Sequence, residues 1–263
     1  MIKTDVFSIN DQRILIVGGT AGIGLGVAQH FVEAGARIVI TGRRQDGESI
    51  AKGIGCSFVY MDLTDSDSIT AGTGRAAELL DGGFDTLILN AGIATSAGTA
   101  DQLDITALRQ VFEVNFFGIA QAMRDGLAFM QSGSSIIVTS SPASTQLTPG
   151  AGAYGASKAA IDTLVKTAAL ELGLGGIRVN AVLPGVIETE MAFDPDAADE
   201  ELAMLSTLTA TGKVRQPSAM GPPFQFLASA ASETCTGTLL ACDDGVGAGY
   251  SQLLLQKAFG QGE

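Results

Sequence analysis

The stretch "RILIVGGTAGIGLGVAQHFVEAG", residues 13–35, joins an apolar run to a glycine-rich turn and then to a helical pattern. Residues 13–19 are typical of a buried β-strand, and residues 22–35 of a helix. The glycines of the turn permit a tight connection and let the backbone approach a pyrophosphate at the helix N-terminus. Because such turns also occur without a ligand, the spacing alone does not prove binding. The glycines concerned are Gly18, Gly22 and Gly24.

Apolar runs of strand length alternate with helical patterns along the rest of the chain. The runs lie at residues 36–42, 56–62, 84–92, 134–141 and 177–185, with a last short one within 236–245. The helical patterns lie around residues 65–80, 104–131 and 153–174. Near-continuous apolar strands separated by helices are typical of a parallel sheet covered on both faces. We therefore predict an α/β, doubly wound, Rossmann-like fold that forms a single domain over residues 1–263.

Composition and charge restrict the partners. The chain has 15 basic and 28 acidic residues and a formal net charge of −13. A surface this acidic repels phosphate backbones and anionic membranes, so we expect no nucleic-acid partner and no membrane. The polar N-terminus lacks the apolar core of a signal peptide, and no run of 18 apolar residues is present. We therefore expect a cytoplasmic protein.

The sequence contains a single histidine, His30, and three cysteines, Cys56, Cys235 and Cys242. One histidine excludes multi-histidine metal sites and leaves Ser-His-Asp or Cys-His catalysis dependent on one residue. His30 lies in a helical pattern with no acidic or cysteine cluster nearby, so we interpret it as structural. The cysteines fit no metal spacing, and we expect buried, reduced thiols and no metal.

A tyrosine and a lysine stand one helical turn apart in "GAYGASKAAIDTL", residues 152–164. The spacing puts Tyr154 and Lys158 on one helix face. A free tyrosine has a pKa of about 10, and a nearby ammonium favours the tyrosinate, so the pair is suited to acid–base chemistry. The same spacing is common on ordinary helices. Ser141, at the end of the preceding strand, and Asn115, in an earlier apolar stretch, give the pair its context.

Together these motifs resemble the short-chain dehydrogenase/reductase family. The turn matches the family's T-G-x3-G-x-G motif, with Val17 in place of the threonine. "LNAG" at 89–92 is similar to N-N-A-G, and "PGVIET" at 184–189 to P-G-x-I-x-T. The resemblance implies that a dinucleotide contacts Gly18, Thr20, Gly22, Ile23, Gly24, Arg43, Asp62, Leu63, Asn90, Gly92, Tyr154, Lys158, Pro184, Gly185, Ile187 and Thr189.

The resemblance also implies catalytic roles. Ser141 stands thirteen residues before Tyr154, as the family's catalytic serine does, while Ser140 would point to the opposite side of the strand. Ser141 would orient the substrate oxygen, Tyr154 would exchange its proton, and Lys158 would position the ribose and lower the pKa of the tyrosine. Asn115 would hold a water that links Lys158 to bulk solvent, or would be a plain core amide. The implied reaction is NAD(P)-dependent hydride transfer between a secondary alcohol and a ketone.

The end of the second strand, "ITGRRQD", bears on the choice of dinucleotide. Gly42 stands where the family's NAD enzymes tend to carry aspartate, and Arg43 follows at once. An arginine there can bind the 2′-phosphate of NADP(H). Alternatively, Arg43 and Arg44 are solvated loop charges, and Asp46 reaches the ribose of NAD(H). We favour NADP(H) and keep NAD(H) as the alternative.

Residues 188–216 form a long insertion after the sixth strand, where such folds place substrate lids. The substrate expected from the resemblance is a small-molecule alcohol or carbonyl compound. The apolar candidates for lining its pocket are Pro142, Ala143, Leu147, Met191, Phe193, Met204 and Leu205. Asp244, near the C-terminus, stands where many members of the family carry glycine.

Other functions remain open at this point. A 3-oxoacyl-thioester reductase that acts on an acyl-carrier protein needs basic residues near the end of the helix at 104–131, where Arg124 is the lone cation of "MRDGLAFMQSGS". A second alternative is a regulator that binds a dinucleotide without turnover. Loss of Tyr154 or Lys158 would have favoured it, but both residues are present. An epimerase or dehydratase belongs to longer relatives. The resemblance further implies a homo-oligomer, a tetramer or dimer, built on the helices at 104–131 and 153–174.

Overall fold

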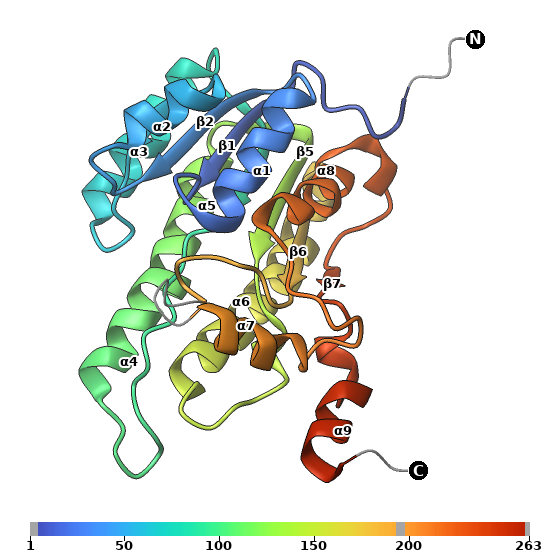
Figure 1. Ribbon diagram of the computed structural model, residues 1–263. Coiled ribbons are helices and arrows are strands. Elements are labelled where there is room, and N and C mark those ends of the chain that lie inside the picture. Colours follow the sequence, from blue (N-terminus) through green and yellow to red (C-terminus); the bar gives the residue numbers. More distant parts are fainter. Residues whose placement is uncertain (1–4, 193–197, 261–263) are drawn as a thin grey trace.

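The computed structural model describes residues 5–192 and 198–260. Over these residues, seven strands form one sheet in the order β3-β2-β1-β4-β5-β6-β7, and every neighbouring pair is parallel (Figure 1). The strands are β1 (Arg13–Val17), β2 (Arg37–Gly42), β3 (Ser57–Tyr60), β4 (Phe84–Leu89), β5 (Met130–Thr139), β6 (Arg178–Pro184) and β7 (Leu239–Cys242). The predicted doubly wound α/β fold is confirmed.

Helices connect the strands and cover the sheet. They are α1 (Gly22–Glu33), α2 (Gly47–Ile54), α3 (Ser66–Leu79), α4 (Ile105–Phe112), the π-helical η1 (Glu113–Gly118), α5 (Ile119–Leu127), α6 (Gly152–Leu172), α7 (Ala198–Ser206), α8 (Gly221–Ala228) and α9 (Gln252–Phe259). Five short 3₁₀ turns complete the described elements, among them η2 (Pro142–Ser144). None of the helices in the described part of the chain is long and apolar enough to cross a membrane.

Two apolar layers hold the helices on the two faces of the sheet (Figure 1). Residues Leu15 and Val17 of β1 point to one layer, which they share with α3, α5 and α6. Residues Ile14 and Ile16 of the same strand point to the other layer, shared with α1, α2 and α8. Because both faces are covered there, the central strands β1, β2 and β4 are apolar on both sides. This is why the strands appear in the sequence as continuous apolar runs.

The sheet order brings the sequence motifs to one edge. From the central pair of β1 and β4, the chain proceeds outward to β2 and β3 on one side and to β5, β6 and β7 on the other. In such sheets, ligands bind at the carboxyl ends of the strands where the order reverses. The glycine-rich turn follows β1, Asn90 follows β4, Ser141 follows β5 and Gly185 follows β6. All four therefore lie at the same edge.

The predicted helix over residues 104–131 is wrong in its last part. α4 begins after Asp104, whose Oδ1 accepts the N–H groups of the first turn, and the helical path continues through η1 to Leu127. Met130 already belongs to β5 and pairs with Phe84, four residues before the predicted start of the strand. A short apolar segment is compatible with either state, and pairing with β4 decides between them. The helices α2 and α9 were not predicted.

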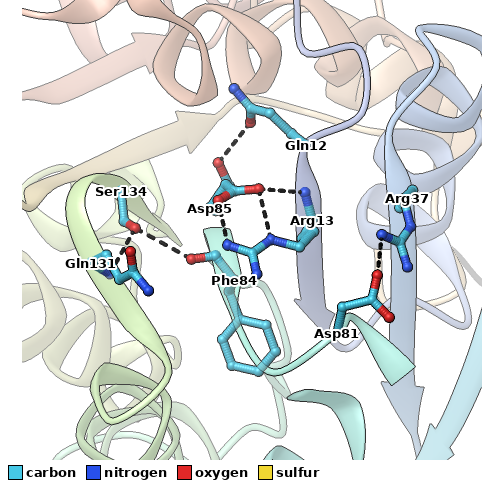
Figure 2. A network of polar contacts seen from close by, with 9 residues as sticks. Gln12, Arg13, Arg37, Asp81, Phe84, Asp85, Gln131 and Ser134 are labelled. Atoms are coloured by element: carbon cyan, nitrogen blue, oxygen red, sulfur yellow. Dashed lines mark hydrogen bonds and ion pairs between the residues drawn. The ribbon is translucent and has the colours of Figure 1, made fainter. Parts of the chain in front are cut away.

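A polar network closes the amino-terminal edge of the sheet, opposite the motifs (Figure 2). The carboxylate of Asp85, at the start of β4, accepts three hydrogen bonds from Arg13, at the start of β1. The donors are the backbone N–H at 2.8 Å, Nε at 3.1 Å and Nη2 at 2.8 Å. Nearby, Arg37 pairs with Asp81 at 2.7 Å. The first pair is partly buried and the second is exposed.

We expect Asp85→Ala to lower the free energy of unfolding by about 1–2 kcal/mol and to leave turnover unchanged. The substitution leaves the guanidinium and backbone N–H of Arg13 without their acceptor, and loss of a charged hydrogen-bond partner has this size at a partly exposed site. The network lies at the edge of the sheet far from the motifs, so kcat is not affected. Urea unfolding and steady-state kinetics measure the two quantities.

Asp81→Ala provides the control for this substitution, since its exposed pair with Arg37 is worth only about 0–1 kcal/mol. The pH dependence gives a second check. Burial raises the pKa of Asp85, but the hydrogen bonds from Arg13 outweigh it, so the net pKa lies below the ordinary value. Its contribution is therefore present above about pH 4 and is lost as the pH falls through the lowered pKa. A wild-type advantage that grew in acid would contradict this account.

Candidate active site

A cavity of about 1000 Å³ lies at the carboxyl-terminal edge of the sheet. Most of the predicted site residues line it: Gly18, Thr20, Gly22, Ile23, Arg43, Asp62, Leu63, Asn90, Gly92, Ser141, Tyr154, Lys158, Pro184, Gly185, Ile187 and Thr189. Two predicted residues do not line it. Gly24 lies within α1, and Asn115 is fully buried in η1. The cavity has the size of a small-molecule or coenzyme site.

The glycine-rich turn forms a cradle that side chains would fill. A Cβ atom at Gly18, where φ is +82°, would lie 2.7 Å from the backbone of Ala91. A Cβ at Gly24 would lie 2.0 Å from the carbonyl oxygen of Gly18. The N-cap of α1 makes no side-chain hydrogen bond and the first turn carries no acidic residue. The N–H groups of this turn are thus available to an anion, and the cradle fits a pyrophosphate.

Asn90 connects this cradle to the opposite wall of the cavity. Its Nδ2 donates to the carbonyl oxygen of Gly18 at 2.8 Å, and its Oδ1 accepts from the hydroxyl of Thr139 at 2.9 Å. The side chain therefore joins the turn after β1 to the end of β5. The resemblance implied an adenosine contact for Asn90, and the hydrogen bonds add a structural role for it.

Tyr154 and Lys158 lie on one face of α6, as their spacing predicts. Lys158 is buried, and its Nζ donates to the carbonyl oxygen of Thr139 at 2.8 Å. Nζ lies 5.6 Å from the centroid of the Tyr154 ring. A Cβ atom at Gly92 would lie 3.6 Å from Nζ, an ordinary contact distance, so Gly92 adjoins the ammonium. The pair is therefore held in the cavity wall.

Burial moves the pKa values of both groups. It lowers the pKa of Lys158 to about 8, although the negative charge of Asp162 acts in the opposite direction. Burial also raises the pKa of Tyr154, and the hydrogen bond with Ser141 only partly offsets it. The expected lowering of the pKa of Tyr154 by Lys158 is therefore not found. Desolvation of the phenolate dominates instead and places the pKa above its ordinary value.

The structure separates the two adjacent serines as predicted. Both serines border the cavity, which Tyr154 also lines. The hydroxyl of Ser140, however, donates a hydrogen bond of 2.5 Å to the buried carboxylate of Asp162, which lies outside the cavity wall. Side chains that follow one another in an extended segment alternate in direction, which explains the difference. Ser141 is therefore the serine that can reach a substrate.

The contacts of Asn115 differ from the role that the resemblance implies. Its Oδ1 accepts the N–H of Ile93 at 2.8 Å, while its Nδ2 donates to the carbonyl of Ile93 at 2.9 Å and to the hydroxyl of Ser157 at 3.1 Å. Both amide hydrogens are thus used within the protein. The side chain fixes the loop after β4 against α6, and the π-helical turn of η1 places it there. A water held by Asn115 stays a prediction.

A family model described as "Enoyl-(Acyl carrier protein) reductase" matches residues 18–247, which is most of the chain. The chain belongs to the short-chain dehydrogenase/reductase family. It is 36% identical over 240 residues to the NADP-dependent (R)-specific alcohol dehydrogenase of Lentilactobacillus kefiri, an alignment that covers 88% of this chain and 94% of that protein. It is 32% identical over 242 residues to the cis-4-hydroxycyclohexanecarboxylate dehydrogenase of Sinomonas cyclohexanicum, covering 89% and 96%.

The fold comparison agrees with the sequence comparison. The solved RhlG/NADP active-site complex of Pseudomonas aeruginosa superposes with a TM-score of 0.87 at 26% identity, covering 93% of this chain and 99% of that one. A family match over most of the chain, together with dehydrogenase relatives of nearly equal length, makes the protein an oxidoreductase. The NADP-dependent relative and the NADP-bound neighbour point to a nicotinamide dinucleotide as the coenzyme.

Charged residues gather at the end of the cavity that follows β2. Arg43 is 58% exposed in its side chain, and its Nη1 lies 3.8 Å from Asp62. Arg44 instead forms two hydrogen bonds with Asp46, at 2.9 and 3.1 Å. Asp46 is held outside the cavity wall by this pair. Of the two arginines, Arg43 is therefore the less engaged by carboxylates, and Asp46 does not face the cavity.

Gly42 has a packing reason to lack a side chain. A Cβ atom there would lie 2.5 Å from the hydroxyl oxygen of Thr20. Thr20 is buried and lies in the glycine-rich turn. An acidic residue at position 42 would therefore have to displace the buried side chain of Thr20.

The substrate end of the cavity is only partly as predicted. Met191 and Leu205 line the wall, whereas Pro142, Ala143, Leu147 and Met204 do not, and Phe193 lies outside the described residues. Leu147 and Met204 are exposed, because an apolar pattern alone does not show which face turns inward. Lining residues that sequence reasoning missed include Ala21, Thr41, Arg44, Tyr60, Met61, Ile93, Ala94, Val114, Thr139, Ser140, Val186, Glu190 and Ala192. Most of these residues are next to a recognised motif in the sequence, and this proximity is the signal that could have identified them.

The remaining sequence candidates take no part in the cavity. His30 Nε2 hydrogen-bonds Gln225 on α8 at 2.7 Å, in agreement with a structural role. The cysteines form no disulfide and are partly exposed, so the expectation of buried thiols is wrong. Burial nonetheless raises the pKa of Cys56 to about 11, which keeps this thiol protonated. Within the described residues, no cluster of ligating side chains could hold a metal ion.

Proposed function

We propose that the enzyme interconverts a secondary alcohol and a ketone through a relay of Ser141, Tyr154, Lys158 and Asn115, with NADP(H) as its preferred coenzyme. The observation that carries this proposal is the arrangement on α6. Tyr154 and the buried Lys158 share one helix face in the cavity wall, and Ser141 lines the same cavity from the end of β5. The named relatives, which are dehydrogenases of alcohol groups, support the same reaction class.

The chemistry divides between coenzyme and protein. The nicotinamide supplies or accepts the hydride when the coenzyme is bound. Ser141 donates a hydrogen bond to the substrate oxygen and stabilises the charge that develops there. Tyr154 gives its phenolic proton to that oxygen during reduction and takes it back during oxidation. Lys158 holds the ribose and its positive charge favours the tyrosinate. Asn115 keeps the loop at Ile93 in place beside them.

Three observations support the preference for NADP(H). Arg43 faces the cavity with an exposed side chain, Gly42 leaves no carboxylate beside it, and Asp46 is engaged by Arg44. A guanidinium binds phosphate oxygens in a forked geometry, whereas a ribose hydroxyl gains little from it. The L. kefiri relative is named as NADP-dependent, and the RhlG complex contains NADP.

We expect Arg43→Ala to weaken NADPH binding about tenfold or more and to leave NADH binding within about twofold, because one charged contact to the 2′-phosphate is worth about 1.4 kcal/mol or more. Titration of coenzyme fluorescence measures both affinities. Arg44→Ala is the matched control, since Asp46 already occupies this guanidinium. Equal losses for the two coenzymes in Arg43→Ala would refute the preference.

We also propose that the described parts of the 188–216 segment, residues 188–192 and 198–216, cover the substrate. The base of this segment is attached to the end of the sheet, because Arg215 exchanges backbone hydrogen bonds with Val186 and Glu188 at 3.1 and 2.8 Å. The guanidinium of Arg215 pairs with Asp244 at 2.6 Å. Met191 and Leu205 of the segment line the cavity together with Glu190, so the segment contributes both apolar and charged groups to the wall. A crystal soaked with a substrate would test the cover directly.

An acyl-carrier thioester is the second candidate, favoured by the description of the matching family model. The charge of the chain argues against it. Arg124 is the cation nearest the expected docking region, and Asp125 engages it at 2.6 Å. With a net charge of −13, the enzyme would repel an acidic carrier protein.

The test is an activity screen with NADP(H) and NAD(H) over secondary alcohols, simple ketones and 3-oxoacyl thioesters. We expect turnover of alcohols and ketones, faster with NADP(H). A rate confined to acyl-carrier thioesters would replace this function by the second candidate. Coenzyme binding without turnover of any compound would instead indicate a regulator.

A homo-oligomer is part of the proposal as well. Phe117 in η1 and Leu170 in α6 expose 55% and 85% of their surface, and Leu174 follows directly after α6 with full exposure. These apolar side chains lie on the helices that the family resemblance associates with subunit contacts. Light scattering in solution should give a multiple of the chain mass of 26.8 kDa.

A further inference from the structure

Two residues of α6 engage two consecutive residues at the end of β5. The carbonyl of Thr139 accepts a hydrogen bond from Lys158, and the hydroxyl of Ser140 donates one to Asp162. Tyr154, Lys158 and Asp162 follow one another at intervals of four, so they lie on one helix face. The proposed relay uses Lys158. It does not use the contact between Ser140 and Asp162.

Asp162 is a carboxylate in an environment that disfavours charge. Its side chain is 6% exposed, and the hydroxyl of Ser140, at 2.5 Å, is its hydrogen-bond partner. Isolated buried charges are costly, so such a group is retained where an opposite charge compensates it. Lys158 stands one helical turn before Asp162 and is itself 4% exposed. The two buried charges therefore stabilise each other across one turn of α6.

No other charge within the described elements packed on α6 competes for this role. Arg109 of α4 and Glu113 of η1 are exposed to solvent. Arg178 of β6 is engaged by the carbonyl of Leu227 and the hydroxyl of Ser232. Within α6 itself, Lys166 and Glu171 are exposed, and Tyr154 is the neutral phenol that faces Lys158. β5 contributes only uncharged side chains to this contact.

We infer that Asp162, held by Ser140, is a positioning residue that keeps Lys158 protonated in its buried site. This inference rests on the proposed function, since it assigns Lys158 the task of binding the coenzyme ribose as an ammonium. Asp162 does not touch substrate or coenzyme, because it lies outside the cavity wall. It acts through Lys158. Ser140 fixes the carboxylate and, as the neighbour of Ser141, also ties the end of β5 to α6.

The inference predicts a change in pH dependence. Burial lowers the pKa of Lys158, and the negative charge of Asp162 opposes this effect. Without that charge, Lys158 releases its proton at a lower pH. Coenzyme affinity in the wild type should weaken as the pH rises through the value at which Lys158 deprotonates. In Asp162→Asn, we expect the midpoint of this loss to move down by about one pH unit, with about tenfold weaker binding between the two midpoints. Asp162→Glu should restore most of the wild-type profile.

Coenzyme fluorescence titrations between about pH 6 and about pH 9.5 measure this midpoint without any need for turnover, since they span the range in which a lysine of lowered pKa titrates. Glu171→Gln is the matched control, because it removes a carboxylate from the exposed face of the same helix. If Asp162→Asn does not fold, the double variant Ser140→Ala/Asp162→Leu removes the charge without leaving a buried polar group unpaired. It should show the same shift.

An unchanged midpoint in a folded Asp162 variant would overturn the inference, and so would an equal shift in Glu171→Gln. Failure of the proposed function looks different. In that case the wild type binds coenzyme with the same pH dependence but turns over no alcohol or ketone. The binding experiment and the activity screen therefore fail independently of each other.

Discussion

Tyr154→Phe should lower kcat/KM by about a thousandfold while coenzyme binding stays within about twofold of the wild type. The phenol is the proton donor and acceptor in the proposed relay, and positioned acid–base groups typically contribute about 10²–10⁴ in rate. Phenylalanine keeps the ring that lies 5.6 Å from the ammonium of Lys158, so the change is confined to one oxygen atom. Steady-state kinetics with a secondary alcohol or ketone, together with coenzyme titration, measure both effects.

Two observations would separate this effect from a general disturbance of the fold. Tyr250→Phe is the control, since Tyr250 is 81% exposed and lies outside the cavity. It should have wild-type kinetics. The loss in Tyr154→Phe should also persist at every pH tested, because no ionisation restores the missing hydroxyl. A Tyr154→Phe enzyme that turned over near the wild-type rate would remove the tyrosine from the mechanism.

The fold was predictable because each strand obeys the same rule. Continuous apolar runs such as Ile14–Val17 imply a sheet covered on both faces, and parallel strands place the loops at their carboxyl ends along one edge. The glycine-rich turn, Asn90 and Ser141 therefore had to be neighbours once the strands were recognised. The order of the strands could not be derived from these runs, because periodicity does not specify which strands pair.

The failures have physical causes as well. Residues 127–131 are apolar enough for a helix or a strand, and pairing of Met130 with Phe84 decides in favour of the strand. The pKa of Tyr154 could not be predicted in direction, since proximity to Lys158 is visible in the sequence but desolvation is not. The hydrogen bonds of Asn115 with Ile93 depend on the π-helical turn of η1, for which the sequence gives no signal.

Lys158→Met should weaken coenzyme binding at least tenfold and lower kcat by about a hundredfold, because it removes both the ribose contact and the charge that favours the tyrosinate. Methionine fills a similar volume without charge, so packing in the wall is largely kept. The carbonyl of Thr139 loses its donor and Asp162 loses the opposite charge. Kinetics and coenzyme titration near neutral pH measure the loss, and Lys166→Met on the exposed face of α6 serves as the control.

Lys158→Met should also change the pH dependence of the free energy of unfolding, which a loss of coenzyme binding alone would not do. In the wild type, the pKa of Lys158 is about 8 in the folded protein and 10.5 in the unfolded chain. The unfolded state therefore binds more protons between these values, and stability falls as the pH is lowered from 10.5 to about 8. The methionine variant lacks this term of about 3 kcal/mol. Relative to the wild type, the variant should therefore be more stable below pH 8 than at pH 10.5, that is, its free energy of unfolding minus that of the wild type should be larger there. A difference that did not change with pH would mean that Lys158 is not desolvated in the folded enzyme.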